Sequence, residues 1–211
     1  MRVLDLTRVL AGPTCGRTLA LFGADVLRVG ASRLPSVEPF VIDTGAGKRN
    51  TSLDLTDPDD AATTRRLVEA ADVVVCGYRP GALDRHGFGP GDLLALRPGL
   101  VVVLVDCYGH SGPWAGRPGW EQLAQSAAGI AAAEGEGSPQ LLPAAATDYT
   151  TGYLAAAGVL DALARRRSDG GSYVVRASLC ATARWLSGAG TDLDPAEAAG
   201  VDPTATITMD T

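Results

Sequence analysis

Short apolar runs alternate with longer amphipathic stretches along the chain. Five runs are rich in valine and leucine, and several of them are continuous: Val3–Leu6, Val26–Val29, Val73–Cys76, Leu100–Val105 and Tyr173–Val175. A continuous apolar run is typical of a strand that is buried on both faces of a parallel sheet. The pattern therefore predicts at least five strands, paired mainly in parallel.

The stretches between these runs predict helices. They cover about Thr14–Phe22, Pro58–Ala70, Gly119–Ala132, Tyr149–Arg167 and Leu179–Leu186. Strands that alternate with helices form βαβ units, so the chain is predicted to be an α/β protein with a mostly parallel, Rossmann-like twisted sheet flanked by helices. This domain covers residues 1–186. Residues 187–211 contain few apolar side chains and predict a flexible polar tail.

Composition and charge narrow the class of protein. The chain has 211 residues, of which 46% are hydrophobic and 20% charged, as expected for one globular domain. A net charge of −6 argues against nucleic-acid binding. No apolar run approaches the roughly 20 residues that a membrane-spanning helix needs. The charged N-terminal stretch is unlike a signal peptide. The four cysteines are widely spaced and there are two histidines, so we expect reduced thiols in the cytoplasm and no metal site.

One glycine-rich segment, Gly45-Ala-Gly-Lys-Arg49, resembles a phosphate loop only superficially. A Walker loop would need glycine at Ile42 and serine or threonine at Arg49, and the dinucleotide pattern would need glycine at Asn50. Neither a Walker loop nor an NAD site is therefore predicted. The segment leaves Lys48 and Arg49 side by side on a predicted loop, either as solvated charge or as donors to phosphates.

A second segment, Tyr78-Arg79-Pro80-Gly81, directly follows a predicted strand. Ligands of open parallel sheets bind beyond the carboxyl ends of the strands. The segment is either a plain β-turn or a rigid site for an adenine base and its phosphates, with Arg85 close behind.

Two acidic residues begin predicted helices. Glu121 follows a long Gly/Pro-rich loop, on which His110 is expected to be a surface residue. Asp148 stands at an expected N-cap position, before the most periodic helix. It is either a plain N-cap or an ionised carboxylate that attacks a thioester, with room for substrate left by small neighbours such as Gly152.

Five stretches together resemble the class III CoA-transferase family, which includes formyl-CoA and carnitine CoA-transferases and 2-methylacyl-CoA racemases. They occur in the family's order and are VLDLTRVLAGPTCGRTLALFGADVLRV, GAGKRNTSLDL, ADVVVCGYRPGALDRHGFGPGDL, GPWAGRPGWEQLAQSAAGI and TDYTTGYLAAAGVLDALARR. The resemblance implies that Asp148 is the catalytic aspartate. It would form an anhydride with the acyl group and then an aspartyl-CoA thioester, from which an acceptor acid takes the CoA. The resemblance also implies CoA contacts from Val9, Leu10, Ala11, Lys48, Arg49, Tyr78, Arg79 and Arg85.

Two departures from the family pattern matter. The racemases have a His-Asp pair where this chain has Trp120-Glu121. A racemase would need Glu121 as a base, so a transferase is favoured and Glu121 is kept as a secondary polar group. Family chains are also about twice as long, and this chain resembles a single large-domain half. The resemblance implies acyl-CoA and a carboxylic acid as substrates, and a homodimer or a complex with a complementary half. The alternative is a CoA-binding half without catalysis of its own.

Overall fold

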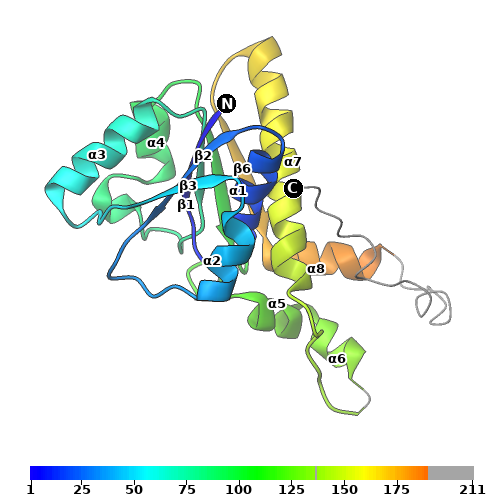
Figure 1. Cartoon of the computed structure of the whole chain (residues 1–211). Coiled ribbons are helices and arrows are strands. Elements are labelled where there is room, and N and C mark those ends of the chain that lie inside the picture. Colours follow the sequence, from blue (N-terminus) through cyan, green and yellow to red (C-terminus); the bar gives the residue numbers. More distant parts are fainter. Residues whose placement is uncertain (136, 190–211) are drawn as a thin grey trace, which may run out of the picture.

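The structure is a computed structural model that describes residues 1–135 and 137–189, and it contains one parallel sheet (Figure 1). The strands of the sheet lie in the order β3-β2-β1-β4-β5-β6, and each neighbouring pair is parallel. Their bounds are β1 (Arg2–Leu6), β2 (Asp25–Gly30), β3 (Lys48–Ser52), β4 (Val73–Cys76), β5 (Val101–Asp106) and β6 (Tyr173–Ser178). This arrangement confirms the predicted α/β class and Rossmann-like sheet.

Valine side chains of the central strands fill two cores, one on each face of the sheet. Val73, Val75 and Val103 belong to one core, whereas Val74 and Val102 belong to the other. All five are fully buried. Successive side chains of a strand point to opposite faces, so a continuous valine run supplies both cores at once.

Helices cover both faces of the sheet, as Figure 1 shows. On one side lie α3 (Pro58–Glu69) and α4 (Pro90–Leu96), and on the other lie α1 (Ala11–Leu21) and α7 (Ala146–Asp169). The remaining helices are α2 (Glu38–Gly45), α5 (Glu121–Ala128), α6 (Ile130–Glu134), α8 (Leu179–Gly188) and the short 3₁₀-helix η1 (Asp84–His86).

Helices α1 and α7 pack closely because Gly152 has no side chain. A Cβ atom at this position would lie 2.6 Å from the carbonyl oxygen of Ala11 and 2.6 Å from the Cβ of Thr14. The expectation that Gly152 leaves room for a substrate is therefore wrong, since α1 fills that space.

Several element boundaries differ from the predictions. The predicted loop at Lys48 and Arg49 is the edge strand β3, which the apolar pattern missed because its sequence is polar and only β2 pairs with it. Helices α2 and α4 were not predicted, and the predicted helix at 119–132 is divided by Gly129, which has φ of 91°. Helix α8 continues to Gly188, two residues into the predicted tail. Residues 190–211 of that tail lie outside the described residues.

The chain reverses its direction of sheet growth between β1 and β4. From β1 it adds β2 and β3 on one side, and then crosses over to add β4, β5 and β6 on the other. The loops after β1 and β4 therefore separate and leave a crevice at the carboxyl edge, where ligands of such sheets bind. Within residues 1–135 and 137–189, no helix is both long and apolar enough to cross a membrane.

Candidate active site

A cavity of about 350 Å³ lies at this crevice. The loops after β1, β2, β3 and β4 all contribute to it, together with the end of the loop that leads into α5. Its apolar part is formed by Leu6, Val29, Leu34, Leu53, Leu55 and Leu83, and its cationic part by Arg8, Arg33, Arg79 and Arg85. Although the chain is acidic overall, this cavity therefore suits an anionic ligand that also has an apolar portion.

Two of these arginines are held by neighbouring groups. The Nε of Arg33 donates to Asp54 at 2.6 Å, and Arg8 donates to the carbonyl of Pro35. The Arg33 hydrogen bond, together with hydrogen bonds from Thr56, holds the pKa of the Asp54 carboxyl well below its usual range. Sequence reasoning named neither Arg8 nor Arg33. They are separated by a strand, so only the parallel pairing of β1 and β2 brings them to one cavity.

The charged and aromatic residues that were expected to contact CoA fall into two groups, one that lines the cavity and one that does not. Tyr78, Arg79 and Arg85 all line the cavity, as expected from their position after β4. Burial raises the pKa of Tyr78, so its hydroxyl stays protonated. Lys48 and Arg49 do not line it.

Lys48 and Arg49 form ion pairs within the protein instead. The Nζ of Lys48 lies 2.8 Å from Asp5 and 2.7 Å from the carbonyl of Pro13, and both charged side chains are fully buried. Arg49 pairs with Asp25 at 2.7 Å. Asp25 begins β2, so this pair lies toward the amino ends of the strands, away from the cavity.

Asp148 and Glu121 form a buried acidic pair where α5 and α7 begin. Each residue is 4% exposed. Glu121 accepts hydrogen bonds from the backbone N–H groups of Thr147 (3.1 Å) and Asp148 (2.6 Å) and from the hydroxyl of Thr147 (2.7 Å). Glu121 therefore satisfies N–H groups in the first turn of α7 that have no partner within the helix.

The environment of Asp148 favours its protonated form. Burial, and secondly the charge of Glu121, raise the pKa of Asp148 to about 7. We expected the start of the helix to keep this carboxylate ionised, and the structure corrects this expectation. Ala145 is the N-cap residue, Asp148 is the third residue of the helix, and Glu121 already occupies the N–H groups that would have stabilised its charge.

Gln125 supports Glu121 from the same helix. Its Nε2 donates to Glu121 at 2.6 Å and to the carbonyl of Ala144 at 3.2 Å, while its Oε1 accepts from the N–H of Leu142 at 2.8 Å. It joins α5 to the segment before α7. The i, i+4 spacing of Glu121 and Gln125 was a signal that both lie on one helix face.

The start of α1 packs against α7 one helical turn beyond Asp148. Gly152 follows Asp148 by one helical turn and contacts Ala11, so the start of α1 packs against the same side of α7. Leu10 and Ala11 are buried, whereas Val9 is 44% exposed with a φ of 69°. A β-branched residue in this left-handed region is strained, and such strain concentrates at functional sites.

The acidic pair lies next to the cavity but does not line it. Neither Asp148 nor Glu121 lines the cavity, but Gly119 and Trp120 do, and they directly precede Glu121. The cavity thus extends to the N-terminus of α5.

His110 is not the surface histidine that we expected. Its Nδ1 lies 2.9 Å from Asp106, and burial lowers its pKa. It lines a second cavity of about 260 Å³, which shares Tyr78, Arg79 and Leu83 with the first. Among the described residues, no group of three potential metal ligands was found.

Comparisons with known proteins agree with this geometry. Residues 1–199 match the sequence profile of CoA-transferase family III, and the chain belongs to this family. It is 39% identical over 197 residues to the acetyl-coenzyme A transferase nodX of Hypoxylon pulicicidum, covering 88% of this chain and 33% of that protein. It is 32% identical over 193 residues to a formyl-CoA:oxalate CoA-transferase of Rhodopseudomonas palustris, covering 85% of this chain and 45% of that protein.

A solved structure supports the same assignment. Rv3272 from M. tuberculosis superimposes with a TM-score of 0.84 at 32% identity, covering 89% of this chain and 54% of that chain. The chain thus spans between about a third and about half of the length of these relatives. The predicted resemblance to a single half of a family member is confirmed.

Proposed function

We propose that the protein takes part in acyl-CoA:carboxylate CoA transfer, with Asp148 as the nucleophile. The observation that carries this proposal is the buried Asp148 carboxyl, whose pKa is raised to about 7 beside Glu121. A carboxylate of raised pKa is more nucleophilic than an ordinary one and is still ionised in part at neutral pH. Family membership and the adjoining arginine-lined cavity point to the same chemistry.

The cavity would hold the nucleotide end of CoA. Its apolar part would accommodate the adenine ring beside Tyr78, and its arginines would bind the phosphates, which prefer planar bidentate donors. The strained loop of Val9, Leu10 and Ala11 would lie at the thioester end. Lys48 and Arg49 are not included in this site, because both are engaged in ion pairs and neither lines the cavity.

The reaction would proceed through Asp148 in four steps. A carboxylate oxygen of Asp148 attacks the thioester carbonyl, the C–S bond breaks, and CoA thiolate leaves an acyl-aspartyl anhydride. The thiolate then attacks the aspartyl carbonyl and releases the donor acid, which gives an aspartyl-CoA thioester. The acceptor carboxylate attacks this thioester to form a second anhydride and thiolate. Attack of the thiolate on the new acyl carbonyl releases the product acyl-CoA and restores the Asp148 carboxylate.

Glu121 would contribute by raising the energy of the free nucleophile. Asp148 is an anion before attack and part of a neutral anhydride afterwards, so the repulsion from Glu121 is relieved as the bond forms. Glu121 also fixes the first turn of α7 through its hydrogen bonds. It is a positioning residue in this scheme.

A second candidate function is that of a CoA-binding half that works with another polypeptide. The chain covers 33% of the acetyl-coenzyme A transferase and 45% of the formyl-CoA:oxalate CoA-transferase. We propose that it acts as a homodimer or with a complementary half. All four cysteines are free thiols, which agrees with the proposed cytoplasmic location.

Intact-protein mass spectrometry would distinguish the two functions. The protein is incubated with acetyl-CoA or succinyl-CoA, and the adduct is trapped with hydroxylamine or borohydride. A modified peptide that contains Asp148, and its loss in Asp148→Ala, are expected for a transferase. Binding of CoA without modification of Asp148 would identify a binding half. Unchanged CoA transfer by Asp148→Ala would disprove the mechanism.

A further inference from the structure

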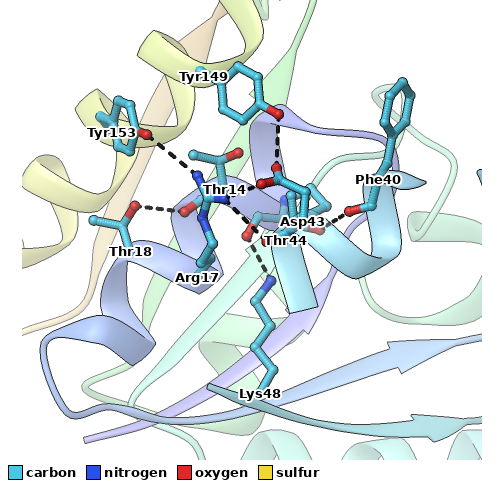
Figure 2. Close-up of polar contacts among 10 residues, drawn as sticks. Thr14, Arg17, Thr18, Phe40, Asp43, Thr44, Lys48, Tyr149 and Tyr153 are labelled. Carbon is cyan, nitrogen blue, oxygen red and sulfur yellow. Dashed lines mark hydrogen bonds and ion pairs between the residues drawn. The ribbon is translucent and has the colours of Figure 1, made fainter. Parts of the chain in front are cut away.

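A polar cluster on the outer side of α7 joins three helices beside Asp148. It consists of Arg17 from α1, Asp43 from α2 and Tyr149 from α7, with Tyr153 at its edge, and it is drawn in Figure 2. One oxygen of Asp43 accepts from the hydroxyl of Tyr149 at 2.8 Å, and the other accepts from Arg17 at 2.7 Å. Arg17 also lies over the ring of Tyr149, 5.8 Å from its centroid.

The cluster contacts the same helical turn whose backbone N–H groups Glu121 accepts from. Tyr149 directly follows Asp148, and successive residues of an α-helix are rotated by about 100° around its axis. A fixed Tyr149 ring therefore limits rotation of this turn and the direction in which Asp148 points. Glu121 anchors the backbone of the turn, and Asp43 anchors its side chain.

Helix α2 contributes little to the core. Burial of apolar side chains therefore does not explain the position of Asp43. Thr44 is the one buried residue of α2, and Ile42 is 71% exposed. Asp43 also accepts through its backbone carbonyl from Arg17, at 3.2 Å. One residue of an exposed helix thus makes contacts with both α1 and α7.

We propose that Arg17, Asp43 and Tyr149 are positioning residues that fix the direction of the Asp148 carboxylate. This proposal rests on the proposed role of Asp148 as nucleophile. The charge that acts on that carboxylate is Glu121 from α5, and the Arg17–Asp43 ion pair reaches the same helix through Tyr149. Tyr149 remains a protonated donor, because burial and its hydrogen bond to Asp43 raise the pKa of its hydroxyl.

The test compares Tyr149→Phe and Asp43→Asn with a matched control, Tyr153→Phe. Tyr153 is the next tyrosine on α7, and its hydroxyl accepts a long hydrogen bond of 3.4 Å from Arg17, whereas the hydroxyl of Tyr149 donates to Asp43 at 2.8 Å. Titration of ¹³C-labelled aspartate carboxyls by NMR follows Asp148 directly, with Asp148→Asn used for assignment. The apparent pKa of Asp148 is expected to fall in Tyr149→Phe and Asp43→Asn, because the loosened turn admits water, and to stay unchanged in Tyr153→Phe.

CoA transfer from succinyl-CoA to acetate gives a second measurement. A positioning role predicts that kcat of Tyr149→Phe falls about tenfold, while KM for the acyl-CoA changes by less than about twofold. A variant that is merely less stable would lose active protein without a change in the carboxyl titration. Wild-type titration in both Tyr149→Phe and Asp43→Asn overturns the proposal, whether or not the chain transfers CoA alone. By contrast, transfer that survives in Asp148→Asn overturns the proposed function and leaves the titration result standing.

Discussion

The carboxylate of Glu121 accepts a hydrogen bond of 2.6 Å from the backbone N–H of Asp148. One acidic residue therefore orders the helical turn that carries another, although the two carboxyl groups repel each other. Both are 4% exposed, so water screens little of this repulsion. The repulsion raises the free energy of the ionised form of Asp148, and the ionised form is the one that acts as a nucleophile.

Replacing Asp148 by Asn should increase stability and abolish transfer. The raised pKa means that ionisation of Asp148 opposes folding. Below its unfolded pKa near 3.8 the group is protonated in both states. As pH rises from there to about 7, the unfolded chain ionises first and stability is lost. Asp148→Asn should therefore gain on the order of 4 kcal/mol over wild type at pH 8 and little at pH 4.

Urea unfolding at the two pH values measures this difference, and acyl transfer is followed in parallel. Asp161→Asn is the matched control, because Asp161 lies on the same helix in an exposed ion pair with Arg165. It should show neither effect. Equal stability of Asp148→Asn and wild type at both pH values would contradict the raised pKa.

Glu121→Gln should shift the pH dependence of transfer to lower pH. The amide removes the charge that contributes to the raised pKa of Asp148, but its oxygen still accepts hydrogen bonds. The rate should rise with pH through the ionisation of Asp148, with a midpoint near 7 in wild type and below it in Glu121→Gln. The measurement is kcat against pH, and an unchanged midpoint would show that burial alone sets this pKa.

Lys48 and Arg49 are neighbours whose loss should lower stability by very different amounts. Lys48→Ala leaves the fully buried Asp5 without its partner and should cost about 3–5 kcal/mol of stability. Arg49→Ala breaks an exposed pair and should cost less than about 1 kcal/mol. Chemical denaturation measures both. Calorimetric titration with CoA should give the same affinity for Arg49→Ala as for wild type. A large loss of affinity would show that Arg49 contributes to CoA binding.

The arginines of the cavity should bind CoA through its phosphates. Arg33→Ala and Arg85→Ala should each weaken CoA binding by about tenfold at low salt, with a smaller effect at high salt. Arg165→Ala is the control, because that side chain is exposed on α7 and does not line the cavity. Salt-independent affinity in all three variants would argue against phosphate binding at this cavity.

Gly152→Ala should separate α1 from α7. The added Cβ meets backbone and a β-branched side chain, neither of which can move aside cheaply. We expect a loss of about 1–3 kcal/mol and reduced transfer, because the loop at Val9 shifts relative to Asp148. Gly188→Ala, at a helical glycine with open space around it, should be nearly neutral. Thermal unfolding of the two variants provides the comparison.

The sequence predicts the sheet well because its signals are local. Val73–Cys76 and Leu100–Val105 are continuous apolar runs, and a strand buried on both faces needs such a run. The edge strand β3 carries no comparable signal. Its residues Lys48–Ser52 are polar, and pairing with β2 alone makes them a strand.

The candidate site was only partly predictable, because it depends on contacts between distant residues. Asp148 and Glu121 were identified separately, but nothing in their spacing of 27 residues indicates a hydrogen bond between them. The pattern left Lys48 as either solvated charge or a phosphate donor, because its partner, Asp5, is 43 residues away. Arg33 joins the cavity through the pairing of strands. The residue types indicated which chemistry is possible, whereas the fold determines which charged side chains pair with one another.

The position of β1 has consequences for how the protein folds during synthesis. Of the six strands of the sheet, the first to be synthesised becomes a central strand, whose Val3 pairs with Val26 on one side but must wait for Val73 on the other. The helix that packs against α1 arrives later still, with residues 146–169. Until then, the valine-rich face that α7 finally covers stays exposed on the nascent chain. Slow translation ahead of α7 would lengthen this interval and increase the need for chaperones.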